Sequence, residues 1–175
     1  MEAVQPRVEQ ACVDDERSPP VEQAKRLIVT VTGLADRLRD LPPLFFRLIL
    51  AYGFIGPGLE KAKHFSATAE WFGSLGIPFP TLNLAMAIST EIGGSILLLL
   101  GLATRFISVP MSFVMVVAIA TVHWKNGFAA GDNGFEIPFY YMLMLFSLIA
   151  TGGGRLSLDH LISRKLGLPG SGADK

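Results

Sequence analysis

The chain has 175 residues, 50% of them hydrophobic and only 17% charged, and its 15 basic and 15 acidic residues give a formal net charge of +0. A soluble domain carries about 25% charged residues, so this composition is typical of one membrane-embedded domain. The balanced charge gives no indication of a nucleic-acid partner. A single cysteine, Cys12, excludes an internal disulfide, and the three histidines lack metal-ligand spacing, so we expect no metal site.

The first 40 residues are more polar than the rest of the chain. Residues 1–26 contain no apolar segment of the kind found in secretory signals, and we predict a disordered cytoplasmic tail over residues 1–20. Across residues 21–40, apolar side chains such as Leu27, Val31 and Leu38 recur at three- and four-residue steps, with basic residues between them. This spacing predicts an amphipathic helix along the cytoplasmic membrane surface, with a partner-binding helix as the alternative.

Four apolar stretches follow. A helix needs about 20 largely apolar residues to cross a hydrocarbon core of ~30 Å. The stretches that meet or approach this length are Leu41–Leu59, Leu82–Leu102, Phe106–His123 and Phe135–Thr151. We therefore predict an all-α fold, with a four-helix transmembrane bundle over residues 41–163 and a flexible C-terminal tail over residues 164–175.

The connections between these stretches indicate how the bundle is arranged. Residues 103–105 predict a tight turn, and the apolar, aromatic residues 60–81 predict a segment on the membrane interface. Basic residues of short loops accumulate on the cytoplasmic side of bacterial membranes. Arg37, Arg39, Arg47, Arg105, Arg155, Arg164 and Lys165 fall on one side, and Lys61, Lys63 and Lys125 on the other. This excess predicts that both termini are cytoplasmic.

Glu91 is an acidic residue inside a predicted span, ~14 Å from the start of that span. A carboxylate at that depth is destabilising unless it is paired, hydrated or protonated. One interpretation is a fastener that is hydrogen-bonded to a neighbouring helix, and the other is a group that accepts a proton or binds a ligand. Arg47 begins the first span at its cytoplasmic end, so its depth argues against a direct pair with Glu91.

Four other titratable side chains, those of Lys61, His64, His123 and Glu136, fall at the outer ends of the predicted spans. Each alone is well explained as an interface anchor. If water enters from the outer face, Glu91 joins them in one cluster. We take Glu91, His123 and Lys61 as candidate catalytic residues.

Several sequence elements occur in a particular order. They are Arg47, Gly58-Leu59-Glu60-Lys61, Gly76-Ile77-Pro78-Phe79-Pro80, Glu91, Leu99-Leu100-Gly101-Leu102-Ala103-Thr104-Arg105, His123 and Gly154-Arg155-Leu156-Ser157-Leu158-Asp159. In this order and spacing, from Arg47 to about Ile162, the chain resembles the DoxX family of small four-helix bacterial membrane proteins. The segment His123-Trp124-Lys125-Asn126-Gly127 is similar to a branch linked with small exported metal-binding peptides.

The resemblance implies a bacterial inner-membrane protein in a quinone-linked redox system or in stress or metal handling, because some relatives are subunits of a thiosulfate–quinone oxidoreductase. A quinone head needs an apolar slot, hydrogen-bonding groups and a proton route. Glu91, His123 and Glu136 form the candidate quinone site on this hypothesis, with Lys61 beside them. A non-enzymatic scaffold or assembly partner and a small-solute or proton transporter are the alternatives. A membrane-protein partner and a homo-oligomer both stay open.

Overall fold

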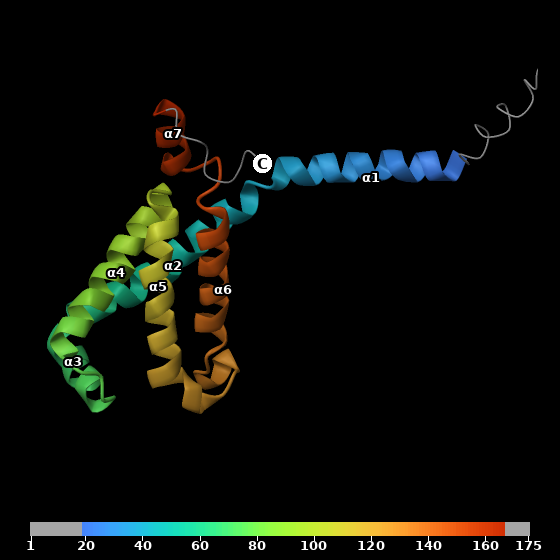
Figure 1. Cartoon of the computed structure of the whole chain (residues 1–175). Coiled ribbons are helices and arrows are strands. Elements are labelled where there is room, and N and C mark those ends of the chain that lie inside the picture. Colours follow the sequence, from blue (N-terminus) through green and yellow to red (C-terminus); the bar gives the residue numbers. More distant parts are fainter. Residues whose placement is uncertain (1–18, 167–175) are drawn as a thin grey trace, which may run out of the picture. The chain divides into compact units, whose positions relative to one another are not determined.

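The computed structural model describes residues 19–166, and the regular structure over this range is entirely helical, with no β-strand (Figure 1). The all-α prediction is confirmed for these residues. The chain divides into two units between Arg39 and Asp40. Cys12 and most of the tail predicted over residues 1–20 lie outside the described residues.

The described part of the first unit is the helix α1 (Pro19–Leu38). Proline suits the first turn because that turn has no acceptor for a backbone N–H. The apolar side chains of Leu27, Ile28 and Val31 are all exposed. A helix is therefore present where the spacing predicted one, and its placement on a membrane surface stays a prediction.

The second unit contains the membrane helices. They are α2 (Leu41–Lys63), α3 (Phe65–Ser74), α4 (Pro80–Leu100), α5 (Thr104–Ala118), α6 (Glu136–Thr151) and α7 (Leu158–Lys165). A π-helical turn (Ile119–His123) and a 3-10 turn (Trp124–Asn126) extend α5, and a further 3-10 turn (Ala130–Asp132) precedes α6.

Three helical segments of the described chain are long and apolar enough to cross a membrane, namely Leu41–Lys63, Pro80–Leu100 and Thr104–Asn126. The fourth apolar helix, α6, has 16 residues. At 1.5 Å per residue it is ~24 Å long, shorter than a hydrocarbon core of ~30 Å. Three of the four predicted spans are thus confirmed by length and composition, and the fourth crossing stays a prediction.

The core of the second unit lies where α2, α4, α5 and α6 pack together (Figure 1). Its buried apolar residues are Leu50, Ala51, Phe54, Leu98, Met111, Leu145 and Leu148. Glycine allows close approach at two helix contacts. A β-carbon at Gly94 of α4 would overlap Met111 of α5, and one at Gly53 of α2 would overlap Tyr141 of α6. Small residues at such contacts are the usual means by which membrane helices pack.

Two short helices lie in segments for which no helix was predicted. The segment over residues 60–81 contains α3, and the predicted C-terminal tail begins inside α7, which includes Arg164 and Lys165. The rest of that tail, residues 167–175, lies outside the described residues. Pro57 lies within α2, which continues past it to Lys63. Pro57 is exposed, so its ring displaces no neighbouring helix.

The turn between α4 and α5 is closed by a carboxylate from the far end of the chain. Asp159 of α7 accepts hydrogen bonds from the amides of Ala103 and Thr104, at 2.7 and 2.9 Å, and its own amide donates to the carbonyl of Gly101. The first amides of a helix have no partner within the helix and carry partial positive charge. Asp159 therefore caps the start of α5.

Arg47 satisfies the opposite kind of helix end. Its guanidinium donates to the carbonyls of Leu98 and Leu99 in the last turn of α4, at 2.8 and 3.1 Å, and to those of Gly153 and Leu156 at 2.9 Å each. Carbonyls in the last turn of a helix lack some of their partners within that helix, and a cation there is favoured by the helix dipole. Arg47 is buried and joins α2, α4 and the segment after α6.

Candidate functional site

The centre of the candidate site is an ion pair between Lys61 and Glu91. Nζ of Lys61, in the last turn of α2, lies 2.5 Å from Oε1 of Glu91, near the middle of α4. The Glu91 side chain is 2% exposed and that of Lys61 is 24% exposed. A buried carboxylate is strongly stabilised by a cation, and a long lysine side chain can reach inward while its ammonium keeps contact with the outside.

The second carboxylate oxygen of Glu91 has a different environment. Oε2 is buried and has no hydrogen-bond donor among the described residues. It lies beside Gly58, where an added β-carbon would be 3.5 Å away from it. The Ser95 hydroxyl donates to the backbone carbonyl of Glu91, at 2.6 Å, and not to the Glu91 carboxylate. Glu91 therefore keeps an acceptor that can take a proton or a ligand's donor group.

From the sequence, we expected Arg47 to lie at a different depth from Glu91 and not to pair with it. The structure confirms that the Arg47 guanidinium binds other groups. The four hydrogen bonds of its guanidinium all go to backbone carbonyls. Lys61, grouped with Glu91 only on the condition that water entered the bundle, turns out to contact it directly. The sequence alone did not show this contact because it depends on how far α2 and α4 are offset along their axes.

His123 lies at the end of the π-helical turn that extends α5. Its Nδ1 is 2.8 Å from the carbonyl oxygen of Asn133. A carbonyl only accepts, so Nδ1 carries the hydrogen in this contact, and Nε2 of a neutral ring is then a hydrogen-bond acceptor. Single π-helical turns are rare in proteins, but those that occur are often found at functional sites.

Glu136 is the first residue of α6, and its carboxylate accepts hydrogen bonds from the connection before the helix and from the helix itself. Its Oε2 accepts from the amide of Ala130 at 2.9 Å, and its Oε1 accepts from the hydroxyl of Tyr140 at 3.2 Å. Aromatic rings pack around this connection. Trp124 stacks on Phe135 with centroids 5.5 Å apart. His123 and Glu136 are thus both fixed to the same loop.

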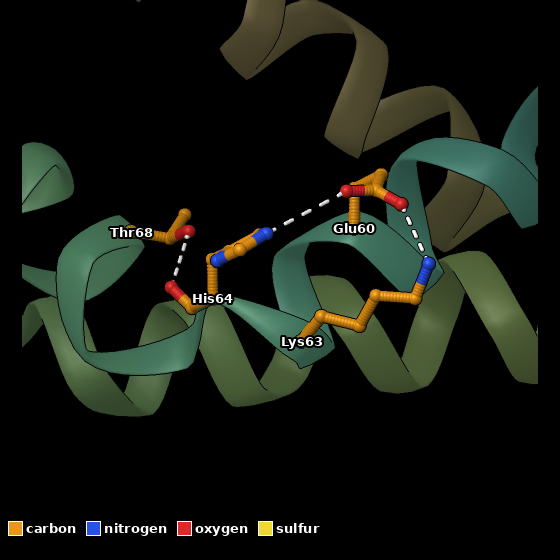
Figure 2. Close-up of polar contacts among 4 residues, drawn as sticks. All are labelled: Glu60, Lys63, His64 and Thr68. Atoms are coloured by element: carbon orange, nitrogen blue, oxygen red, sulfur yellow. Dashed lines mark hydrogen bonds and ion pairs between the residues drawn. The ribbon is translucent and has the colours of Figure 1, made fainter.

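The predicted cluster is therefore divided. Lys61 and Glu91 form one pair, whereas His123 and Glu136 bond to the α5–α6 connection, and no hydrogen bond or ion pair links the two sets within residues 19–166. His64 belongs to neither set, because it contacts Glu60 across 3.8 Å at the exposed corner between α2 and α3, where Lys63 also pairs with Glu60 (Figure 2).

An open apolar hollow of about 420 Å³ lies along the end of α5 and the facing side of α6. It is lined by Val116, Ile119, Ala120, Trp124 and Met142. None of the candidate site residues lines it, although Trp124 directly follows His123. The hollow can hold a lipid-soluble group, and the chemistry of this region depends on the polar side chains near it.

Together, the apolar helices and the buried ion pair define a helical membrane protein with a polar site inside its bundle. The comparisons with known proteins identify its family. Residues 43–124 match the family model described as DoxX. The chain belongs to the DoxX family.

Relatives of this chain share much of its length. The "Putative oxidoreductase CatD" of Bacillus subtilis (strain 168) is 33% identical over 125 residues, which cover 70% of this chain and 88% of CatD. The "Inner membrane protein YphA" of Escherichia coli (strain K12) is 33% identical over 123 residues, 66% of this chain and 86% of YphA. An uncharacterised protein of Haemophilus influenzae is 33% identical over 129 residues, 69% of this chain and 83% of that protein.

No solved structure matches the chain significantly. With inner-membrane relatives and three apolar helices of sufficient length, the chain is a bacterial inner-membrane protein in contact with lipid.

Proposed function

We propose that this protein is a component of a quinone-linked redox system and that Lys61 and Glu91 are its proton-handling residues. The observation that carries the proposal is their pairing, in which an almost fully buried carboxylate meets an ammonium that is partly exposed. The name of the Bacillus subtilis relative, a putative oxidoreductase, supports a redox role.

We further propose that α6 crosses the membrane as the fourth span and that both termini are cytoplasmic. A helix of 16 apolar residues can cross where the bilayer thins locally, at a modest energetic cost. Arg105, Arg155 and Lys165 would then lie on the cytoplasmic side, as the distribution of basic residues predicts. Lys61, His123 and Glu136 would lie toward the opposite side.

A quinone, when bound, accepts two electrons and two protons, and a sulfur-containing reductant such as thiosulfate would supply the electrons on this hypothesis. Lys61 can donate a hydrogen bond to a carbonyl oxygen that reaches the end of α2 from the lipid. Glu91, behind it, can hold a proton and return it through Lys61. Lys61, whose side chain is 24% exposed, would then regain its proton from the side of the membrane that it faces.

The residues present fit a quinone head in one respect and limit its position in another. Lys61 supplies a donor, and Oε2 of Glu91 supplies a free acceptor. Gly58 packs closely on Glu91 and Ile92, so a ring cannot enter between α2 and α4 at this contact. A ring would therefore contact Lys61 and not Glu91. The role of Glu91 would be limited to holding and releasing a proton.

The test is a quinone titration of purified protein in nanodiscs, with decylubiquinone as the probe and tryptophan quenching as the signal. We expect saturable binding in the wild type and at least tenfold weaker binding in Lys61→Met. With thiosulfate added as the reductant, Glu91→Gln should abolish the proton uptake that accompanies quinone reduction, while leaving thermal stability near that of the wild type. Glu60→Gln, which removes an exposed carboxylate paired with Lys63, is the matched control and should behave as wild type.

Two results would contradict the proposal. One is the absence of saturable binding by the wild-type protein, and the other is a Glu91→Gln variant with unchanged proton uptake. Either outcome would leave the ion pair as a structural fastener.

A scaffold that recruits a partner is the second candidate, favoured by the exposed apolar side chains of α1, among them Leu27, Ile28 and Val31. In that case, deletion of residues 1–40 should remove a co-purifying protein, and Glu91→Gln should mainly lower stability. A complex that survives the deletion would count against this candidate.

A further inference from the structure

The helix α7 (Leu158–Lys165) lies at the end of the bundle where α4 turns into α5 (Figure 1). Asp159 holds it there, because its carboxylate accepts from the amides of Ala103 and Thr104. One apolar span ends at Leu100, and the next begins at Thr104. α7 is therefore fixed at the level at which two spans leave the hydrocarbon core.

The polar groups of this end agree with that level. Arg47 donates to the carbonyls of Leu98 and Leu156, and Asp40 accepts from the amide of Arg155 at 3.2 Å. Charged side chains are destabilising in the middle of a bilayer and are common in the headgroup region. This end of the bundle is therefore at the membrane boundary.

The polar side of α7 faces the protein. The half-buried residues of the helix are Asp159, His160 and Ser163, and the Ser163 hydroxyl donates to the carbonyl of Asp159 at 2.9 Å. The apolar side chains of the helix and its C-cap are 37% to 66% exposed. They form the outward face of α7, which consists of Leu158, Leu161, Ile162 and Leu166. A helix on a water-exposed surface has the opposite arrangement, with its apolar side toward the core.

Lipid is the partner that already contacts the protein at this level. The side chains of Leu99 and Leu100 in the last turn of α4, and of Phe106 in the first turn of α5, are exposed and apolar. Residues 167–175, which follow α7, include only one large apolar residue, Leu168. That segment has too few apolar side chains to cover the outward face.

Basic side chains accompany the outward face. Arg164 and Lys165 are exposed in the last turn of α7, and neither forms an ion pair with any residue of the described range 19–166. The single acidic residue of α7, Asp159, is used by the cap on α5. The stem of a lysine or arginine can lie along apolar surface while its charge reaches a headgroup. Clustered basic residues at a membrane surface attract anionic lipids.

We infer that the outward face of α7 lies in the headgroup region of the bilayer and that Arg164 and Lys165 bind the phosphates of anionic phospholipids there. The apolar side chains then contact the upper part of the acyl chains, and the polar side stays on the α4–α5 turn. A short amphipathic helix with basic residues is suited to this boundary. The inference depends neither on quinone binding nor on which side of the membrane this end faces.

Lipid quenching tests the position of the face. In a Cys12→Ser background, which contains no other cysteine, Leu161→Cys and Ile162→Cys are introduced one at a time and labelled with an NBD fluorophore. The protein is placed in nanodiscs whose phospholipids are brominated in the upper part of the acyl chains. His160→Cys, on the polar side of the same helix, is the matched control. Phe106→Cys is the positive control, because Phe106 is 83% exposed at the start of a span.

We expect quenching at positions 161 and 162 to be several times that at position 160 and comparable to that at position 106. Melting temperatures near that of the parent protein establish that the labelled variants are folded. Two positions on the outward face are labelled so that misfolding of one variant leaves the test intact.

A second measurement concerns the lipid charge. The label at position 162 is used in nanodiscs that mix phosphatidylcholine and phosphatidylglycerol, with bromine on one lipid or on the other. After correction for abundance, we expect quenching by phosphatidylglycerol to exceed that by phosphatidylcholine at least about twofold. The ratio should fall to near one when Arg164→Gln and Lys165→Gln are combined. Lys125→Gln, an exposed basic position of the α5–α6 connection, is the control and should leave the ratio unchanged, as should added inorganic phosphate.

Three results would overturn the inference. The first is equal quenching at positions 160, 161 and 162, and the second is a lipid ratio near one while both charges are present. The third is quenching at position 162 that appears only when each nanodisc holds a single copy, because a second copy would then be what covers the face.

Discussion

Gly58 of α2 lies against Glu91 of α4 so closely that a β-carbon at position 58 would be 3.1 Å from Cβ of Glu91 and 2.9 Å from Cγ1 of Ile92. Lys61 is three residues further along α2, on the same side of the helix. The contact between glycine and glutamate therefore sets the separation across which the lysine reaches the carboxylate.

We predict that Gly58→Ala destabilises the protein, because the added methyl meets a β-carbon that cannot move without its helix. Overpacking of this kind costs roughly 1–3 kcal/mol. Gly93→Ala is the matched control on α4, where nothing lies within 4 Å of the added atom, and it should be neutral or stabilise by up to about 1 kcal/mol. Thermal melting in detergent compares the two, and equal effects would contradict the close contact.

The Lys61–Glu91 pair should respond asymmetrically to neutralisation. Lys61→Met leaves an almost fully buried carboxylate without its cation, which should cost roughly 3–5 kcal/mol. Glu91→Gln leaves an ammonium that can turn toward the outside and should cost much less. Adding Glu91→Gln to Lys61→Met should recover most of the lost stability, and denaturant unfolding of the four proteins gives the coupling. Additive effects would show that the two side chains do not interact.

Arg47 should not be replaceable by lysine. Its three guanidinium nitrogens serve four carbonyls, and a lysine ammonium cannot reach the same spread of acceptors. Each buried carbonyl left without a donor costs about 1–3 kcal/mol, so Arg47→Lys should lower unfolding stability by roughly 2–5 kcal/mol. Arg105→Lys, at an exposed position near the same end of the bundle, should have little effect on the melting temperature.

Asp159→Asn tests the cap on α5. The amide side chain can accept through one oxygen only, so one of the bonds to Ala103 and Thr104 is lost together with the charge. We expect a loss of about 1–2 kcal/mol and faster amide exchange at residues 103–104, measured by hydrogen–deuterium exchange. Asp132→Asn, at an exposed position of the α5–α6 connection, serves as the control. Unchanged exchange at those amides would argue against the cap.

Much of the fold was predictable from residue patterns. Long apolar runs predicted three spans because a membrane selects helices of a given length, and the positions of α4 and of the α4–α5 turn agree with the expected ones within a few residues. The helices α3 and α7 were missed, since both are short and lie in segments that contain prolines, glycines or charges. Their formation depends on packing against neighbours.

The candidate site was predicted in part. The depth of Glu91 and the distant position of Arg47 followed from residue counts along a helix. The direct pairing with Lys61 and the role of Gly58 depend on the offset and separation of two helices, which no local pattern encodes. Asp159 was noticed only as part of a family element, and its contact with residues 103–104 joins parts of the chain 55 and 56 positions apart.

That long separation has a consequence for biosynthesis. The α4–α5 hairpin is translated and available for insertion while Asp159 has not yet been made. The amides of Ala103 and Thr104 must therefore enter the membrane boundary without their carboxylate, and this end of the bundle is completed only when α7 leaves the ribosome. If translation stopped before residue 158, the inserted helices would keep an uncapped α4–α5 turn, which would be accessible to quality-control proteases.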